Sequence, residues 1–397
     1  AGLNAWKAGR DILTDNVISF ENKQQANKSN MQWYACHDIR TNHRVSAVDP
    51  NDAKKVTFDN KSEGHMIWHA GNDIDTRSKT EFISQQNSKG SVTWYAGNDI
   101  HTRYGTVTPS TLTNGVNFKQ EGEGRTIWQA GNDLITHNAV HFQFTNNAKD
   151  WASLGLLAGR NIVLGGVNVS EYDVNNTSVR NEFKVETEVN DTVVLHAKDG
   201  YILTNSLVNL ERSNTGAALT KLWAGCGTFN TNNNIDVEHT FNYTEPTGKG
   251  QDAGSLIYLY AENDILSNQD AASGTCDTRQ APITFSVPQS SKTITLWEAE
   301  RNINTMGRVD FAYGAATSAG PLTWLSRGGY IQTERPVTIA YKSDSTISFL
   351  AEDWRHDATH ASAGNFTTTG RRGNIHFFDS VRINRNNTAA GMTQLKA

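Results

Sequence analysis

The chain of 397 residues has little proline, cysteine or net charge, and each shortage excludes a class of protein. Seven prolines exclude a proline-rich linker chain, and three cysteines exclude a fold built on disulfides. A net charge of -5 and a pI near 6.2 provide no basic surface for nucleic acid or an anionic membrane. No run of about 18 apolar residues occurs, so we expect no transmembrane helix.

The composition favours strands and turns over helices. Hydrophobic residues make up 37% and charged residues 19% of the chain, and the mean hydropathy is -0.55. Much of the remainder is Asn, Thr, Ser and Gly, residues typical of turns and strands. The chain begins at Ala1 without a methionine or an apolar leader, so we expect a processed or excised piece of a longer product.

A short motif recurs along the chain. The strings WHAGNDIDT, WYAGNDIHT and WQAGNDLIT begin at Trp68, Trp94 and Trp128. About twelve copies, some looser, can be followed, and repetition at such intervals predicts a structural unit rather than a catalytic motif. At the tryptophan position the other copies have Trp6, Trp33, Leu156, Leu195, Leu222 or Trp223, Leu259, Trp297, Trp324 and Phe349.

Alternation within the motif predicts which side chains point inward. In strictly alternating strands one face is buried, and Trp68 and Ala70 share a face. Val56 and Phe58, in a second strand signal between copies, alternate in the same way. The residues between the inward ones, such as His69, are polar and are predicted to point outward. We predict the following core and turn residues: Trp6, Trp33, Trp68, Trp94, Trp128, Trp297, Trp324, Ala70, Gly71, Asp73, Gly97, Asp99, Gly131 and Asp133.

These strands predict a right-handed parallel β-helix. One repeat of about 30 residues cannot bury its apolar stripe alone, so successive coils stack and pair in parallel. We expect a single all-β solenoid over residues 1–397, with about twelve coils. Residues 1–150 form lean coils, and 151–397 have longer loops, where binding is expected. The predicted loop insertions are 165–180, 205–220, 228–254, 267–281 and 355–373.

The Gly-Asn-Asp string is interpreted as a tight turn. Glycine and asparagine tolerate a positive φ, and the aspartate can accept backbone N–H groups within its turn. The column of aspartates also suggests calcium, but Ca²⁺ needs about six to eight oxygen ligands. The glycine-rich nonapeptide of calcium-binding β-rolls is missing as well. We therefore favour a capping role for each aspartate.

The repeated strings AGNDI-x-T, AGRDI and AGRNI resemble the repeats of large secreted β-helical exoproteins of Gram-negative bacteria. Filamentous haemagglutinin-like adhesins and autotransporter passengers are the nearest types, and the resemblance covers most of the chain. It implies a secreted or surface protein that adheres to host cells, neighbouring bacteria or matrix polysaccharide. The regularity of the tryptophan departs from this pattern, and the resemblance is specific for the fold rather than for the task.

Two further sets of residues are weak candidates for specific chemistry. His356, Asp357 and His360 are potential metal ligands, but their small-residue surroundings favour a solvated loop. A disulfide between Cys226 and Cys276 is one prediction, and free thiols are the alternative. We expect no cofactor.

Three functions follow from this pattern. An extracellular adhesin or matrix-binding shaft, non-catalytic and acting through surface strips and loops, is the first. A self-assembling extracellular fibre subunit, which would associate end to end, is the second. A carbohydrate-active β-helix enzyme is the third, but the outward acids Asp75, Glu81, Glu298 and Asp310 are scattered over several coils. Outward aromatic residues (Tyr34, Tyr95, Tyr258 or Tyr260) could stack on sugar rings, although ordinary surface aromatics are the favoured interpretation.

Overall fold

A computed structural model gives the structure of the protein. Every regular element in the described part of the chain is a β-strand, and that part has no helix long and apolar enough to cross a membrane. The structure describes residues 3–22, 30–41, 55–61, 63–77, 79–84, 90–102, 116–121, 124–137, 139–145, 152–165, 182–187, 191–205, 207–212, 219–226, 232–237, 241–245, 255–267, 282–287, 293–313, 320–341, 346–352, 374–385 and 392–397.

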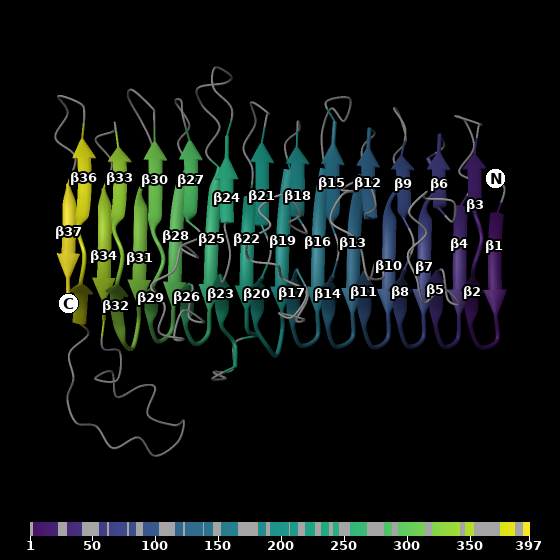
Figure 1. Ribbon diagram of the computed structural model, residues 1–397, viewed down its shortest axis with the longest axis horizontal. Coiled ribbons are helices and arrows are strands. Elements are labelled where there is room, and N and C mark those ends of the chain that lie inside the picture. Colours follow the sequence, from purple (N-terminus) through teal and green to yellow (C-terminus); the bar gives the residue numbers. More distant parts are fainter. Residues whose placement is uncertain are drawn as a thin grey trace, which may run out of the picture. The chain divides into compact units, whose positions relative to one another are not determined.

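The chain forms two compact units. The first comprises Ala1–Lys198 and Leu203–Thr215, and the second comprises Asp199–Ile202 and Gly216–Ala397. Each unit is a parallel β-helix, in which a coil contributes one strand to each of three parallel sheets, here named A, B and C (Figure 1). The predicted fold class, an all-β parallel solenoid, is thereby confirmed.

In the first unit the strands of each sheet follow one another in chain order. Sheet A contains β1 (Leu3–Ala8), β4 (Asn30–Ala35), β7 (Met66–Ala70), β10 (Val92–Ala96), β13 (Gly124–Ala130), β16 (Ala152–Ala158) and β19 (Asp191–Ala197). Sheet B contains β2 (Ile12–Thr14), β5 (Ile39–Thr41), β8 (Ile74–Thr76), β11 (Ile100–Thr102), β14 (Leu134–Thr136) and β17 (Ile162–Leu164). Sheet C contains β3 (Ile18–Asn22), β6 (Val56–Asn60), β9 (Thr80–Ser84), β12 (Val116–Gln120), β15 (Val140–Phe144), β18 (Glu182–Thr187) and β21 (Leu207–Arg212).

The second unit repeats the arrangement. Its sheet A contains β22 (Leu219–Ala224), β25 (Leu256–Ala261), β28 (Ile294–Ala299), β31 (Leu322–Ser326), β34 (Ile347–Ala351) and β37 (Thr393–Lys396). Its sheet B contains β23 (Ile235–Val237), β26 (Ile265–Ser267), β29 (Ile303–Thr305), β32 (Tyr330–Thr333) and β35 (Asn374–Phe377). Its sheet C contains β24 (Phe241–Thr244), β27 (Ile283–Val287), β30 (Val309–Tyr313), β33 (Val337–Tyr341) and β36 (Val381–Arg385), and β20 (Ile202–Thr204) is divided between the units.

The tryptophans of the motif form a buried column in the first unit. Trp33, Trp68, Trp94 and Trp128 are in register in sheet A, and each is fully buried. Trp6 continues the column and stacks on Trp33 at a centroid distance of 5.2 Å, but it is 39% exposed because it belongs to the first strand of the sheet. Such aromatic pairs contribute about 0.5–1.5 kcal/mol each beyond the area they bury.

Leucine replaces tryptophan at some positions of this column, and the strand register stays the same. In the first unit Trp128 is followed by Leu156 and Leu195. In the second unit the column runs through Leu222, Leu259, Trp297, Trp324 and Phe349, so Leu222 points inward and Trp223 outward.

Part of the predicted loop sequence is strand. The insertions expected at 205–220 and 228–254 contain β21, and β23 with β24, respectively. Their short alternating runs, L-V-N-L and I-D-V, are flanked by Asn and Thr, which obscured the strand pattern. The insertions expected at 165–180, 267–281 and 355–373 lie outside the described residues, apart from Gly165 and Ser267, so they stay predictions.

Candidate functional site

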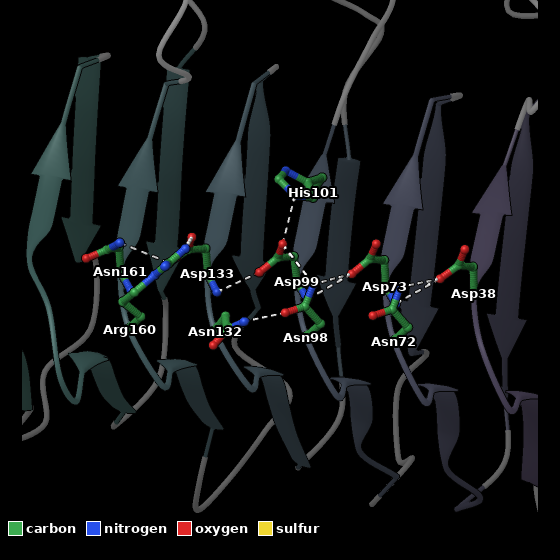
Figure 2. A network of polar contacts seen from close by, with 10 residues as sticks. All are labelled: Asp38, Asn72, Asp73, Asn98, Asp99, His101, Asn132, Asp133, Arg160 and Asn161. Atoms are coloured by element: carbon green, nitrogen blue, oxygen red, sulfur yellow. Dashed lines mark hydrogen bonds and ion pairs between the residues drawn. The ribbon is translucent and has the colours of Figure 1, made fainter.

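The recurrent Gly-Asn-Asp turns are joined by a ladder of hydrogen bonds between coils (Figure 2). Asp73 Oδ1 accepts the backbone N–H of Asp99 at 3.2 Å, and Asp99 Oδ1 accepts the N–H of Asp133 at 2.9 Å. The sequence interpretation, in which each aspartate accepts an N–H of its own turn, placed the donor in the wrong coil. Stacking brings the N–H of the next coil within reach of the carboxylate, so the ladder links neighbouring coils.

The asparagines of the turn supply further donors to these carboxylates. Asn72 Nδ2 donates to Asp38 Oδ1 at 3.0 Å, as Asn98 Nδ2 does to Asp73 Oδ1. Burial alone would raise the pKa of Asp38, but the bonds from Asn72 and the Asp73 N–H and the charges of Arg40 and His37 lower it. These donors offset the repulsion between the stacked aspartates.

Arginine takes the place of asparagine where the ladder meets a less regular coil. Arg160 Nε donates to Asp133 Oδ1 at 2.9 Å, and the N–H of Asn161 donates to the same oxygen at 3.1 Å. In the second unit Arg301 Nε donates to Asp264 Oδ1 at 3.1 Å. The same arrangement in both units indicates a structural role for the turn.

One group of described residues has metal-ligand spacing: the ligand atoms of Asp11, His37 and Asp38 lie within 4.8 Å of one another. His37 Nδ1 lies 3.2 Å from Asp11 Oδ1 and 3.1 Å from Asp38 Oδ2. Asn98, the equivalent residue two coils later, likewise bonds the carboxylate of the preceding coil and that of its own turn. His37 therefore replaces an asparagine of the ladder, and its geometry is explained without an ion.

The glycine of the turn is required for space rather than for a positive φ. Gly71, Gly97 and Gly131 are not among the described glycines with positive φ, contrary to the sequence interpretation. A Cβ added at Gly97 would lie 2.1 Å from the carbonyl oxygen of Gly71, and one at Gly131 would lie 2.0 Å from that of Gly97. Close stacking of coils, not turn geometry, excludes a side chain at these positions.

Several predicted site residues cannot be compared with the structure. His356, Asp357, His360 and Cys276 lie outside the described residues. Cys226 Sγ donates to Asp199 Oδ1 at 3.3 Å. The metal site and the Cys226–Cys276 disulfide therefore stay predictions.

Asp75 and Glu81 of the first unit and Asp310 of the second unit lie on different strands. Asp75, expected on the surface, is only 5% exposed, and its carboxylate accepts a hydrogen bond from Arg77 Nε at 2.9 Å. Each acid pairs with nearby basic residues, Asp75 with Arg77, Glu81 with Lys55 and Lys79, and Asp310 with Arg308.

The outward aromatics of the first unit stack on one another. Tyr34 and His69 have ring centroids 4.6 Å apart at 18°, and His69 and Tyr95 are 4.7 Å apart at 10°. The three residues are in register on β4, β7 and β10. Their ring faces are turned toward each other, so the stack presents mainly ring edges and offers little face area to a sugar.

The second unit has a different cluster on the outward side of sheet A, which we call the aromatic–acidic patch. In register, Lys221 lies beside Tyr258 and Trp223 beside Tyr260, and Tyr260 also lies beside Glu298 on the next strand. The side chains come from three neighbouring strands and from the turns that follow β28 and β31. The patch consists of Lys221, Trp223, Tyr258, Tyr260, Glu298, Glu300 and Arg327.

The three rings of the aromatic–acidic patch are not stacked face to face. Trp223 and Tyr260 meet at 84° with centroids 5.7 Å apart, and Tyr258 and Tyr260 are 6.1 Å apart at 45°. Lys221 Nζ lies 3.4 Å from the Trp223 ring centroid, a cation–π geometry. The rings are half-buried and differ in direction, so they form an uneven aromatic surface.

The hydroxyl groups of the two tyrosines donate hydrogen bonds to carboxylates, which hold the rings in place. Tyr258 Oη donates to Glu298 Oε2 at 2.8 Å, and Tyr260 Oη donates to Glu300 Oε1 at 3.4 Å. Arg327 Nε donates to Glu298 Oε1 at 2.6 Å and lies 3.5 Å from Glu300 Oε1. The network orients the rings before any ligand arrives.

Burial and charge shift the ionisation of this patch. Burial, and then the neighbouring glutamates, raise the pKa values of Tyr258 and Tyr260 above their ordinary value of 10.0. Burial is the main cause that raises the pKa of Glu300. The charges of Glu298 and Glu262 add to it, and Arg327 and the Tyr260 hydroxyl act in the opposite direction. Burial lowers the pKa of Lys221.

The sequence carried a signal for this patch that its interpretation missed. Glu300 and Arg327 stand at the position of the turn glycine, in the strings AERN and SRGG, where the regular copies read AGND. A charged residue in place of that glycine marks a coil whose turn carries a side chain that the regular coils lack. Glu298 was noted as an outward acid and Tyr258 or Tyr260 as an outward aromatic, but the sequence interpretation did not bring them together.

The fold and the patch together define a parallel β-helix with an outward aromatic–acidic surface. Comparison of the chain with models of known protein families, with curated proteins and with solved structures finds no match.

Proposed function

We propose that the protein is an extracellular adhesin or matrix-binding shaft that binds glycan chains through the aromatic–acidic patch. The patch carries this proposal because Trp223, Tyr258 and Tyr260 present aromatic surface beside charged hydrogen-bonding groups. Sugars combine apolar C–H faces with hydroxyls, and such ligands suit aromatic rings flanked by carboxylates, an amine and a guanidinium. The repeat strings, which resemble those of secreted adhesins, support an extracellular location on a host or bacterial surface.

The hydrogen bonds that Glu298 accepts favour binding over catalysis. A glycoside hydrolase needs one protonated acid and one available carboxylate. Glu300, with its raised pKa, would suit the acid, and this observation makes a carbohydrate-active enzyme the second candidate. Both oxygens of Glu298, however, already accept hydrogen bonds, from Arg327 and Tyr258, which leaves a poor nucleophile or base.

The proposal is tested by glycan binding to the purified chain. Trp223→Ala is expected to weaken binding of a bound oligosaccharide about tenfold, the equivalent of roughly 1.4 kcal/mol. Tyr95→Ala, which removes an aromatic ring from the stack in the first unit, is the matched control and should leave affinity unchanged. Equal affinity of the Trp223 variant and the parent, or the absence of any binding on a glycan array, would overturn the proposal.

Two alternative functions have separate tests. Release of reducing ends from a bound polysaccharide would establish that the protein is a carbohydrate-active enzyme. End-to-end self-association stays a prediction, and electron microscopy at low and high concentration tests it, since filaments of uniform width would make assembly the function.

A further inference from the structure

Charge is unevenly distributed across the aromatic–acidic patch. Lys221 lies on β22, over Trp223, whereas the acids gather on the other side of β25, at the end of β28. Glu298 is in register with Tyr260, and Glu300 follows in the next turn. The tyrosine rings thus separate a single amine from a group of carboxylates.

Three carboxylates lie on the acidic side, those of Glu262, Glu298 and Glu300. Glu262 precedes Glu300 in the same turn column, since each follows one of the paired residues Ala261 and Ala299. Glu262 is almost fully buried and accepts a hydrogen bond from Asn233 Nδ2 at 2.6 Å. The charges of Glu262, Glu298 and Glu300 all act on Tyr260. Among these described neighbours, Arg327 is the cation that pairs with the acids, and it binds Glu298 most closely.

Carboxylates beside a tyrosine face favour a cationic ligand. An ammonium group is attracted both to carboxylates and to the quadrupole of an aromatic ring. Uronate and sulfate groups would be repelled by the same carboxylates. Glu300 is the accessible member of the group, with 28% of its side chain exposed, whereas the Glu298 side chain is 9% exposed.

From this arrangement we infer that the patch selects glycans with free amino groups, such as polymers of glucosamine, over acetylated, neutral or acidic glycans. The inference rests on the proposed glycan binding and adds its substrate class. The amino group of a bound sugar lies against Glu300 at the Tyr260 side of the patch, and the pyranose rings lie along the aromatic residues. Lys221, on the opposite side, stays over Trp223.

Calorimetric titration of the whole chain with four hexasaccharides tests the inference. The probes are the hexamers of glucosamine, N-acetylglucosamine, glucose and galacturonate, which differ in charge but share a pyranose backbone. The glucosamine hexamer is expected to bind at least about tenfold more tightly than the acetylated hexamer, a difference of roughly 1.4 kcal/mol, and galacturonate least. Glu300→Gln should reduce that preference severalfold, because it removes the carboxylate charge that the amino group faces.

Two controls distinguish the effect of removing the Glu300 charge from an effect on folding. Glu81→Gln removes a surface carboxylate from the first unit, outside the patch, and should leave the preference intact. Circular dichroism of both variants verifies the fold. Equal affinity for the glucosamine and acetylated hexamers, an unchanged preference in Glu300→Gln, or equally tight binding of a lysine hexapeptide would overturn the amino-sugar inference alone. Failure of all four hexamers to bind would also overturn the proposed function.

Discussion

Trp68 and Trp94 lie in successive coils with ring centroids 4.8 Å apart and planes 2° from parallel. Phe82 meets Trp68 edge-on at 5.3 Å and Trp94 at 5.5 Å. A shift of one residue in strand register would turn each of these rings to the opposite face of its sheet. The recurring tryptophan therefore fixes the register of coil on coil, which explains its regular repetition.

Truncation of one ring in this column should be strongly destabilising. Trp68 is fully buried between Trp33 and Trp94, so Trp68→Ala removes two stacking partners and leaves a cavity. We expect a loss of about 3–5 kcal/mol in the free energy of unfolding. Guanidinium denaturation followed by circular dichroism measures it.

The matched control for this variant is an exposed residue of the same sheet. Gln129 is the outward neighbour of Trp128 in β13, and Gln129→Ala should change stability by less than about 0.5 kcal/mol. Similar losses in both variants would contradict the assignment of the tryptophan column as the core.

The aspartate ladder predicts a contrast between two substitutions at one position. Asp99→Ala removes the acceptor of the Asp133 N–H and should cost about 1–3 kcal/mol. Asp99→Asn keeps an oxygen at Oδ1, as Asn234 does in the second unit, where it accepts the N–H of Asp264 at 3.1 Å. We therefore expect the asparagine variant to retain most of the stability. Equal denaturation midpoints for alanine and parent would show that the ladder contributes nothing.

The stability cost of a glycine-to-alanine substitution should depend on whether the glycine lies in the turn. Gly97→Ala places a Cβ against the carbonyl oxygen of Gly71, so the turn must shift, at a cost of about 1–3 kcal/mol. Gly155 in β16 is the control, because a Cβ there would be 3.9 Å from Ile127 Cγ1, an ordinary contact. Gly155→Ala should be neutral or slightly stabilising. Thermal unfolding of the two variants side by side distinguishes them, and equal melting temperatures would refute the steric explanation.

The fold could be predicted from the sequence because its information is periodic. Alternation placed Trp68, Ala70 and Phe58 inward, and all three are fully buried. Leu222 and Trp223 could not be separated in advance, since two adjacent apolar residues fit both parities, and only pairing of Leu222 with Leu259 decides between them. The partner of each turn aspartate also depended on how coils stack, which a single repeat does not contain.

The aromatic–acidic patch was harder to predict because its members come from different coils and from irregular copies of the motif. Tyr258, Glu298 and Arg327 are widely separated in sequence, and their proximity requires the register of three consecutive strands in sheet A. Outward residues also lack the periodic constraint that identifies the core. The copies of the motif that depart from the repeat therefore indicate where a solenoid has a binding surface. Here these copies have charged residues in the glycine position.

Glu300 predicts how the second unit responds to pH. Its pKa is raised in the fold, mainly by burial and then by the charges of Glu298 and Glu262, against the opposing effects of Arg327 and the Tyr260 hydroxyl. Between its ordinary value of 4.5 and the raised value, the folded chain binds more protons at this residue than the unfolded chain does. The contribution of Glu300 to stability is therefore fully present below pH 4.5 and is lost as the pH rises through the folded pKa.

Glu300→Gln should stabilise the protein relative to the parent at neutral pH, and the stabilities of the two proteins should converge in acid. Melting temperatures from pH 4 to 8 measure this difference, with Glu81→Gln as the control, and a difference that does not vary with pH would exclude the assigned pKa shift.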